Sequence, residues 1–167
     1  MLNIRRAEAS DAALILTFIR ALAENEHLSQ SVVATEQDLL RDGFGAEPKF
    51  RCVIAEWDQT PVGFALFFYN YSTFQGRPGI FLEDLFVNPE FRGKGIGRAL
   101  LVHLAQLAVR ENCGRYVWQV LDWNTPSIEF YKSLGAKLMR EWLTMRVEGT
   151  ALENMAAQGQ PTAEAND

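Results

Sequence analysis

A short glycine-rich segment holds the residues best suited to chemistry. Residues 92–98 contain three glycines and three bases but no acid. Glycine lets a backbone approach a ligand closely, and the unpaired N–H groups at the start of a helix attract anions. A plain turn would need only one or two glycines. The segment therefore predicts an anion cradle, formed by Arg92, Gly93, Lys94, Gly95, Ile96, Gly97 and Arg98.

The spacing of these glycines argues against two common phosphate-binding loops. A nucleoside-triphosphate loop needs GxxxxGK followed by Ser or Thr, and both the spacing and the hydroxyl are missing. A dinucleotide fold needs GxGxxG and an acid about 20 residues later, where this chain has Val117 and Trp118. The anion must belong to another class of ligand.

Two adjacent carboxylates, Glu83 and Asp84, lie in the middle of the apolar segment 80–87. Apolar residues alternate on both of its faces, so we expect a strand that is buried on both sides. Carboxylates are costly to bury unless they are paired or functional. The pair therefore indicates either a catalytic or binding role, or an internal salt bridge to an arginine.

Hydrophobic periodicity and turn signals predict the elements that position these residues. Strands are expected over residues 3–6, 50–56, 62–71, 80–87, 115–120 and 142–147, with the strand 80–87 at the centre of the sheet. Helices are expected over residues 11–23, 35–41, 95–112 and 126–134. Thr35 and Asp38 are spaced like a capping box for the second helix.

This order predicts an α/β fold with a mixed, mostly antiparallel central sheet flanked by helices. A parallel crossover is expected at the glycine-rich loop. The length of 167 residues suits a single domain over residues 1–150. Residues 151–167 are expected to form a helical end, with a frayed polar tail beyond Ala157.

The composition, 48% hydrophobic and 22% charged, is typical of a soluble globular protein. The net charge of −5 argues against a nucleic-acid partner. The chain shows no secretory apolar segment and no apolar run of membrane-spanning length, so we expect no membrane partner. Cys52 and Cys113 are isolated, which predicts buried thiols, no metal site and a reducing cytoplasm.

Two motifs resemble those of the GNAT superfamily of N-acetyltransferases. The acetyl-CoA loop of that family has the pattern Gln/Arg-x-x-Gly-x-Gly/Ala, which Arg92, Gly95 and Gly97 match here. Residues 123–136 are similar to the second motif on the CoA side. Residues 39–45 and 81–87 add a closer resemblance to the diamine (spermidine/spermine) N-acetyltransferase branch, and the likeness spans about residues 3–147.

The resemblance implies acetyl-CoA as co-substrate, no metal, and a homodimer that uses the strand expected at 142–147. It implies that main-chain N–H groups hold the pantetheine and pyrophosphate, with Asn124 touching the cofactor arm. The implied cofactor-binding residues are those of the 92–98 loop together with Phe86, Val87 and Asn124.

Acetyl transfer to an amine requires removal of a proton, because an amine of pKa about 10.4 is almost fully protonated near pH 7. The diamine branch has a glutamate at the place of Glu83, which is therefore expected to act as the base, directly or through a water. Asp84 is expected to orient Glu83 or to bind a substrate ammonium. By the same resemblance, Tyr131 is the acid for the departing thiolate; its spacing from Ile128 and Leu134 also suits a core aromatic.

The expected substrate is a small-molecule amine that is cationic: a diamine, a polyamine or a lysine- or thialysine-like amino acid. Residues 24–47 contain six acids against one arginine, opposite in sign to the glycine-rich loop. The resemblance to the diamine branch implies Glu26 as an acidic substrate contact, with Phe74 expected as an apolar wall for a methylene chain. Neither cysteine has a base at recognisable spacing, which favours direct attack. A peptide N-acetyltransferase and a non-catalytic acyl-CoA sensor stay open as alternatives.

Overall fold

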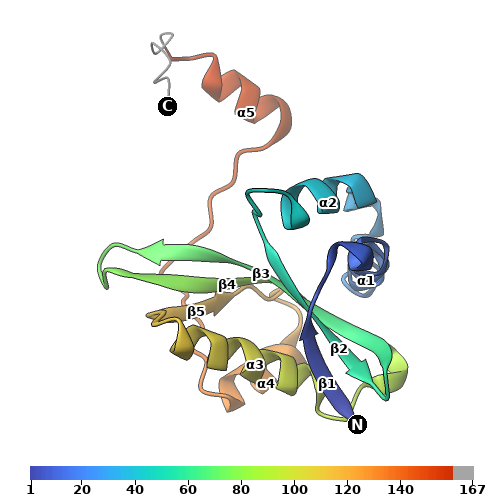
Figure 1. The fold of residues 1–167 in the computed structure, drawn as a ribbon. Helices are drawn as coiled ribbons and strands as arrows, with labels where there is room; N and C mark the ends of the chain where they lie inside the picture. Colours follow the sequence, from blue (N-terminus) through green and yellow to red (C-terminus); the bar gives the residue numbers. More distant parts are fainter. Residues whose placement is uncertain (160–167) are drawn as a thin grey trace. The chain divides into compact units, whose positions relative to one another are not determined.

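A five-stranded sheet in the order β1-β2-β3-β4-β5 organises the first part of the chain in the computed structural model, which describes residues 1–159 (Figure 1). The strands are β1 (Leu2–Arg6), β2 (Arg51–Trp57), β3 (Thr60–Ser72), β4 (Arg77–Val87) and β5 (Arg115–Trp118). Strands β1 to β4 pair antiparallel, and β4 pairs parallel with β5. The predicted α/β fold with a mixed sheet and one parallel crossover is confirmed. The central strand is β3, so β4 is an internal strand next to the edge.

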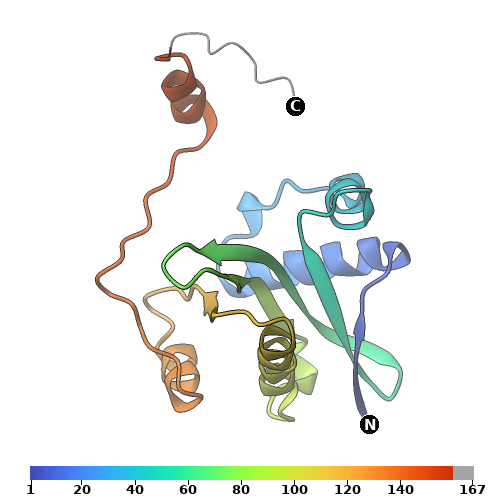
Figure 2. The same ribbon diagram turned by 60° about the vertical axis from the view of Figure 1, so that its left-hand side comes forward.

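Helices cover both faces of this sheet. The helices α1 (Ala12–Asn25) and α2 (Glu36–Phe44) lie on one face, and α3 (Ile96–Arg110) lies on the other (Figure 2). Three short 3-10 turns connect the elements: η1 (Ala9–Asp11), η2 (Ser29–Ser31) and η3 (Pro89–Phe91). The predicted capping box is present, since Thr35 accepts a hydrogen bond from the Asp38 amide and Asp38 accepts one from the Thr35 amide.

Helix α2 continues past the glycine that was expected to stop it. A Cβ at Gly43 would lie 2.3 Å from the Phe50 ring, so close packing explains this glycine better than helix termination does. The other helix boundaries differ from the expected ones by one or two residues, as is usual where helix ends fray.

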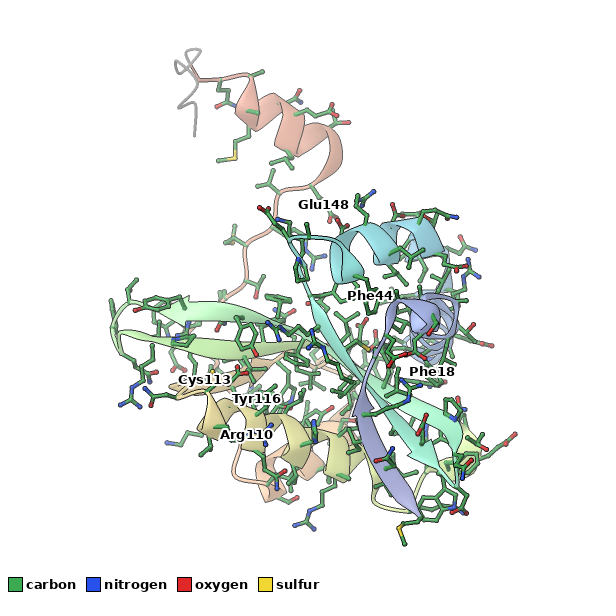
Figure 3. All side chains as sticks on the ribbon, viewed as in Figure 1. Phe18, Phe44, Arg110, Cys113, Tyr116 and Glu148 are labelled. Carbon is green, nitrogen blue, oxygen red and sulfur yellow. The ribbon has the colours of Figure 1, made fainter. Side chains whose placement is uncertain are left out.

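The core beneath α1 is aromatic. Phe18, labelled in Figure 3, belongs to α1. Its ring stacks on Phe64 at 5.5 Å between centroids and lies 5.9 Å from Phe86. Ile15 and Ile54 are fully buried in the same cluster. This packing fixes β3 and β4 beneath α1 and therefore fixes the position of the carboxylates on β4.

A second unit begins at Val120 and contains α4 (Thr125–Ser133) and α5 (Gly149–Ala156). The strand expected at 142–147 is wrong, because these residues form no strand. The apolar pattern is present, but a strand exists only through hydrogen bonds to a neighbouring strand, which a pattern alone does not supply. The side chains of Trp142, Leu143 and Met145 are exposed instead.

The expected division of the chain, one domain over residues 1–150 followed by 151–167, stays a prediction. Helix α5 lies at the expected helical end. The expected frayed tail falls mostly on residues 160–167, which lie outside the described residues.

Substitution of Gly63 by alanine tests how closely the backbones of β3 and β4 approach each other near the candidate site. A Cβ at this position would lie 2.5 Å from the Phe86 carbonyl oxygen, so Gly63→Ala should lower the free energy of unfolding by about 2 to 3 kcal/mol. Gly76→Ala, in the open β3–β4 turn at φ +65, should cost only about 1 kcal/mol for its left-handed backbone. Urea denaturation compares the two variants, and equal losses would contradict the close approach.

Candidate functional site

Strand β4 loses its neighbour on one edge halfway along its length. Residues 79–82 pair with Arg115–Trp118 of β5, and within the described chain residues 83–87 have no partner strand on that side. A β-bulge coincides with this point: Leu66 pairs with Asp84 and Phe67 pairs with Leu82, which leaves Glu83 unpaired. The end of β4 therefore presents open main-chain groups.

The direction of these main-chain groups follows from a neighbouring hydrogen bond. The Asn88 amide donates to the Val62 carbonyl oxygen at 2.8 Å, toward β3. Because successive amides of a strand point to opposite edges, the amide and carbonyl of Val87 point to the open edge. Val87 can therefore offer its N–H to a ligand, as the sequence predicts.

The start of α3 lies against the same end of β4. A Cβ at Gly97 would lie 3.9 Å from the Val87 Cγ2 atom. Gly95 is the N-cap of α3 and provides no side-chain cap. The first amides of the helix, at Ile96, Gly97 and Arg98, lack intrahelical acceptors and favour an anion.

The two glycines before α3 are required by backbone conformation. Gly93 and Gly95 both have φ +78, and no atom lies within 4 Å of a Cβ built at either position. An L side chain would therefore be strained here without being crowded. The glycines shape the turn that aims the α3 amides.

Two of the three bases in this loop are held by the protein itself. Arg92 Nε donates to the Val87 carbonyl oxygen at 3.0 Å, and its guanidinium lies 5.8 Å from the centroid of the Phe86 ring. The Lys94 ammonium lies over two aromatic rings. Arg98 is exposed and forms no hydrogen bond or ion pair within residues 1–159. The Phe86 side chain is buried in the core, so only its backbone can face a cofactor.

Three carboxylates interact electrostatically around Asp84, which lies on the side of the sheet that α1 covers. Asp84 is opposite Leu66, which belongs to the core beneath α1. Burial, reinforced by the charges of Glu83 and Glu26, raises the pKa of Asp84 to about 6. Burial also raises the pKa of Glu26, which is the C-cap residue of α1. The structure thus brings together Glu26, Glu83 and Asp84.

The expectation that β4 is buried on both sides is wrong at the bulge. Glu83 is exposed, and Asp84 is the more buried of the two carboxylates. Neither forms an ion pair with a base in the described part of the chain, so the structure does not show the alternative salt bridge to an arginine. In the acid-rich segment 24–47, by contrast, Asp38 and Asp42 form ion pairs with Arg41 within helix α2.

The remaining expected site residues are Phe74 in the first unit, and Asn124 and Tyr131 in the second. Phe74 lies in the β3–β4 turn and is 97% exposed, and its role as an apolar wall stays a prediction. Asn124 is the N-cap of α4, where its Oδ1 accepts a hydrogen bond from the Ser127 amide at 3.4 Å. Tyr131 is half-buried on the same helix, 5.7 Å between centroids from Phe130. Both belong to the second unit, and their role at the β4 edge stays a prediction.

The cysteines offer no activated nucleophile. Cys52 is buried, and burial raises the pKa of its thiol far above the usual range. Burial also raises the pKa of Cys113. A protonated thiol is a poor nucleophile. Within residues 1–159 no three His, Cys, Asp or Glu side chains are grouped to hold a metal, and no helix is long and apolar enough to cross a membrane.

The sequence did not reveal three features of the site. These are the bulge at Glu83, the hydrogen bond of Arg92 to the β4 edge, and the cation–π contacts of Lys94 with two aromatic rings. Only the last had a sequence signal, because Phe91 is close in sequence to Lys94. The bulge depends on register between strands, which a single-strand pattern does not encode.

Comparison with known proteins identifies this arrangement. The model of the Acetyltransferase (GNAT) family matches residues 16–136. The chain belongs to this family. It is therefore an acetyltransferase enzyme, and the resemblance found in the two motifs is confirmed.

Several relatives of this acetyltransferase are similar over most of its length. Thialysine N-epsilon-acetyltransferase from Sus scrofa is 40% identical over 166 residues, covering 93% of this chain and 97% of that protein. Spermidine/spermine N(1)-acetyltransferase-like protein 1 from Homo sapiens is 41% identical over 141 residues, covering 80% of this chain and 20% of that protein.

Solved structures share the fold of this acetyltransferase. An integron cassette protein from the mobile metagenome of V. cholerae is 31% identical, with a TM-score of 0.77, covering 93% of this chain and 97% of that one. An aminoglycoside acetyltransferase from a soil metagenomic sample is 17% identical with a TM-score of 0.73, covering 88% and 97%. At that identity the likeness shows the fold alone.

The raised pKa of Asp84 predicts a pH-dependent stability. Since the folded state holds this proton more tightly than the unfolded state, the carboxylate destabilises the fold progressively as pH rises from about 4 to about 6. Asp84→Asn should therefore raise the free energy of unfolding on the order of 2 kcal/mol at pH 8 and change little near pH 4. Glu24→Gln, an exposed acid on α1, is the control.

Urea unfolding of Asp84→Asn, Glu24→Gln and the unchanged protein, measured from pH 4 to pH 8, checks this expectation. If the free energies of unfolding of Asp84→Asn and the unchanged protein differed by the same amount at every pH, the pKa of Asp84 would not be raised by folding.

Proposed function

We propose that this enzyme transfers the acetyl group of acetyl-CoA to a primary amine of a small cationic substrate. The observation that supports this most directly is the cluster of Glu26, Glu83 and Asp84, whose negative charges gather around Asp84 on β4. A cationic amine is attracted to such a cluster. Relatives named for thialysine, spermidine/spermine and L-ornithine acetylation support the same substrate class.

The open end of β4 and the start of α3 fit the proposed co-substrate. Acetyl-CoA supplies the activated thioester. The Val87 N–H would bind the pantetheine, and the amides at Gly95, Gly97 and Arg98 would bind the pyrophosphate. Main-chain donors suit this task because they are fixed by the sheet and helix before the ligand arrives.

Deprotonation of the amine is assigned to the carboxylates. We propose that Glu83 accepts the proton, directly or through a water, from its exposed position on the bulge. Asp84 would bind the substrate ammonium or orient Glu83, with Glu26 as a further acidic contact. Phe74 stays proposed as an apolar wall for a methylene chain.

The second unit supplies the proposed acid. Tyr131 would donate its phenolic proton to the departing thiolate, and Asn124 would touch the cofactor arm. The amine freed of one proton by Glu83 would attack the thioester carbonyl carbon directly, so that the new C–N bond forms and the C–S bond breaks. Tyr131 would protonate the departing sulfur, and the second proton released by the nitrogen as the amide forms would restore the phenol. The protonated cysteines support this direct route over a covalent intermediate.

We also propose a homodimer in the cytoplasm, with no nucleic-acid or membrane partner. Exposed apolar side chains in residues 138–147, Leu138, Met139, Trp142, Leu143, Met145 and Val147, support an interface there. The free cysteines support a reducing compartment.

A panel of amines tests the substrate class. Putrescine, spermidine, thialysine, lysine, aminoglycosides and peptides are each supplied with acetyl-CoA, and release of the free thiol is measured. The acidic cluster predicts turnover with small cationic amines. Turnover confined to peptides would replace the proposed substrate, and CoA binding without turnover on any amine would indicate a sensor module.

Tyr131→Phe tests the assigned acid. This variant should bind CoA with unchanged affinity, because the proposed role of the hydroxyl is to protonate the departing sulfur, while kcat falls about 100-fold or more. Tyr71→Phe, an exposed tyrosine of the β3–β4 hairpin, is the matched control and should keep its kcat. Steady-state kinetics and CoA titration separate the two effects. A normal kcat in Tyr131→Phe would remove this residue from the mechanism.

A further inference from the structure

Two side chains fasten the glycine-rich loop to the sheet: Arg92, through the Val87 carbonyl, and Lys94, through aromatic rings. Lys94 lies between the two left-handed glycines, and its Nζ atom is 5.1 Å from the centroid of the Trp57 ring and 5.5 Å from that of Phe91. Trp57 is the last residue of β2, and Phe91 ends η3. One ammonium therefore joins the end of a strand, a 3-10 turn and the loop.

These distances are within the range of cation–π attraction, which reaches about 6 Å from a ring centroid. Both rings are half-buried, so they are held by the surrounding fold. The space around the two glycines on either side of Lys94 stays open, since no atom lies within 4 Å of a Cβ built at Gly93 or Gly95. The contact restrains the loop without filling it.

Between Arg92, which is bonded to Val87, and the buried Ile96, the loop has few other restraints. Nothing lies within 4 Å of a Cβ built at Gly93 or Gly95, and glycine loses more conformational freedom on ordering than any other residue. If the loop were ordered only by its ligand, binding would have to offset that entropy. A clamp on Lys94 removes this cost before the ligand arrives.

We propose that Lys94 is a positioning residue that clamps the loop onto Trp57 and Phe91, so that the amides at the start of α3 are held ready for acetyl-CoA. The proposal rests on the proposed function of the loop. It changes the role expected from the sequence, in which Lys94 adds charge to the anion cradle. Lys94 acts through the loop, and Arg98 is the base left to face the anion.

A phosphate ligand and a clamp make different demands on Trp57. A lysine that binds phosphate needs no aromatic partner, and its loss weakens the salt dependence of binding because one charge contact disappears. A clamp needs both partners, so removing either one should have the same effect. Residues that act as one unit also give non-additive losses.

The test uses Lys94→Met, Trp57→Leu and the double variant in the full chain, with CoA binding measured by titration at two salt concentrations. Each single variant should raise the Kd for CoA about three- to tenfold, from the loss of a contact of cation–π strength. The double variant should be no weaker than the weaker single variant, and the salt dependence should match that of the unchanged protein. Lys49→Met, an exposed lysine before β2, controls for loss of charge.

Hydrogen exchange of the amides at residues 93–98 supplies a readout that is independent of CoA. In the ligand-free protein, Lys94→Met and Trp57→Leu should each exchange several times faster in this loop, whereas Lys94→Arg should restore protection because a guanidinium also stacks on aromatic rings. Trp57→Phe keeps a ring and should keep most of the protection, which guards against a general loss of fold in Trp57→Leu.

Three results would overturn the clamp: unchanged exchange in Lys94→Met, multiplicative effects of the two substitutions on Kd, or a salt dependence that falls in Lys94→Met alone. The last two would make Lys94 a phosphate contact. If the unchanged protein binds no CoA, the proposed function fails, while the exchange experiment still decides whether Lys94 orders the loop.

Discussion

The parallel pairing of β4 with β5 stops at Leu82, and the site depends on that interruption. A strand continued on both edges would have every main-chain group of residues 83–87 engaged in the sheet. Because the neighbour ends early, Val87 keeps its amide available and its carbonyl accepts a hydrogen bond from Arg92, while the opposite edge of β4 stays bonded to β3. The start of α3 lies against this same point, so two sets of unpaired amides converge without any side chain designed to bind an anion.

The bulge at Glu83 adds the negative half of the site. One extra residue in β4 reverses which face the following side chains occupy, so Asp84 and Phe86 face α1 although Leu82, two residues earlier, is opposite Phe67 on the other face. Asp84 is thereby drawn into a partly buried position near Glu26. The aromatic core of Phe18, Phe64 and Phe86 holds this stretch rigidly, so the carboxylates are positioned by the packing of their apolar neighbours.

The sequence was sufficient for the order and type of the elements in the first unit, because alternating strands and the 3.6-residue period of α1 and α3 are local patterns. It was sufficient for the glycine-rich loop, since left-handed glycines and a helix start are encoded within a few residues. It failed for residues 142–147, where a strand requires a partner distant in sequence. It also placed Glu83 in the interior, because the bulge that exposes it depends on the register of β3. The contact of Lys94 with Trp57 was not predictable, since the two residues are distant in sequence.

The docking of Arg92 on Val87 has a consequence for solution behaviour. An exposed strand edge invites other chains to add to the sheet and is a common origin of aggregation. The Arg92 guanidinium donates a hydrogen bond to the Val87 carbonyl oxygen on this edge. It also carries a charge that an incoming β-strand would have to bury. The enzyme therefore keeps an unpaired edge that a small ligand can reach but that another polypeptide is discouraged from extending.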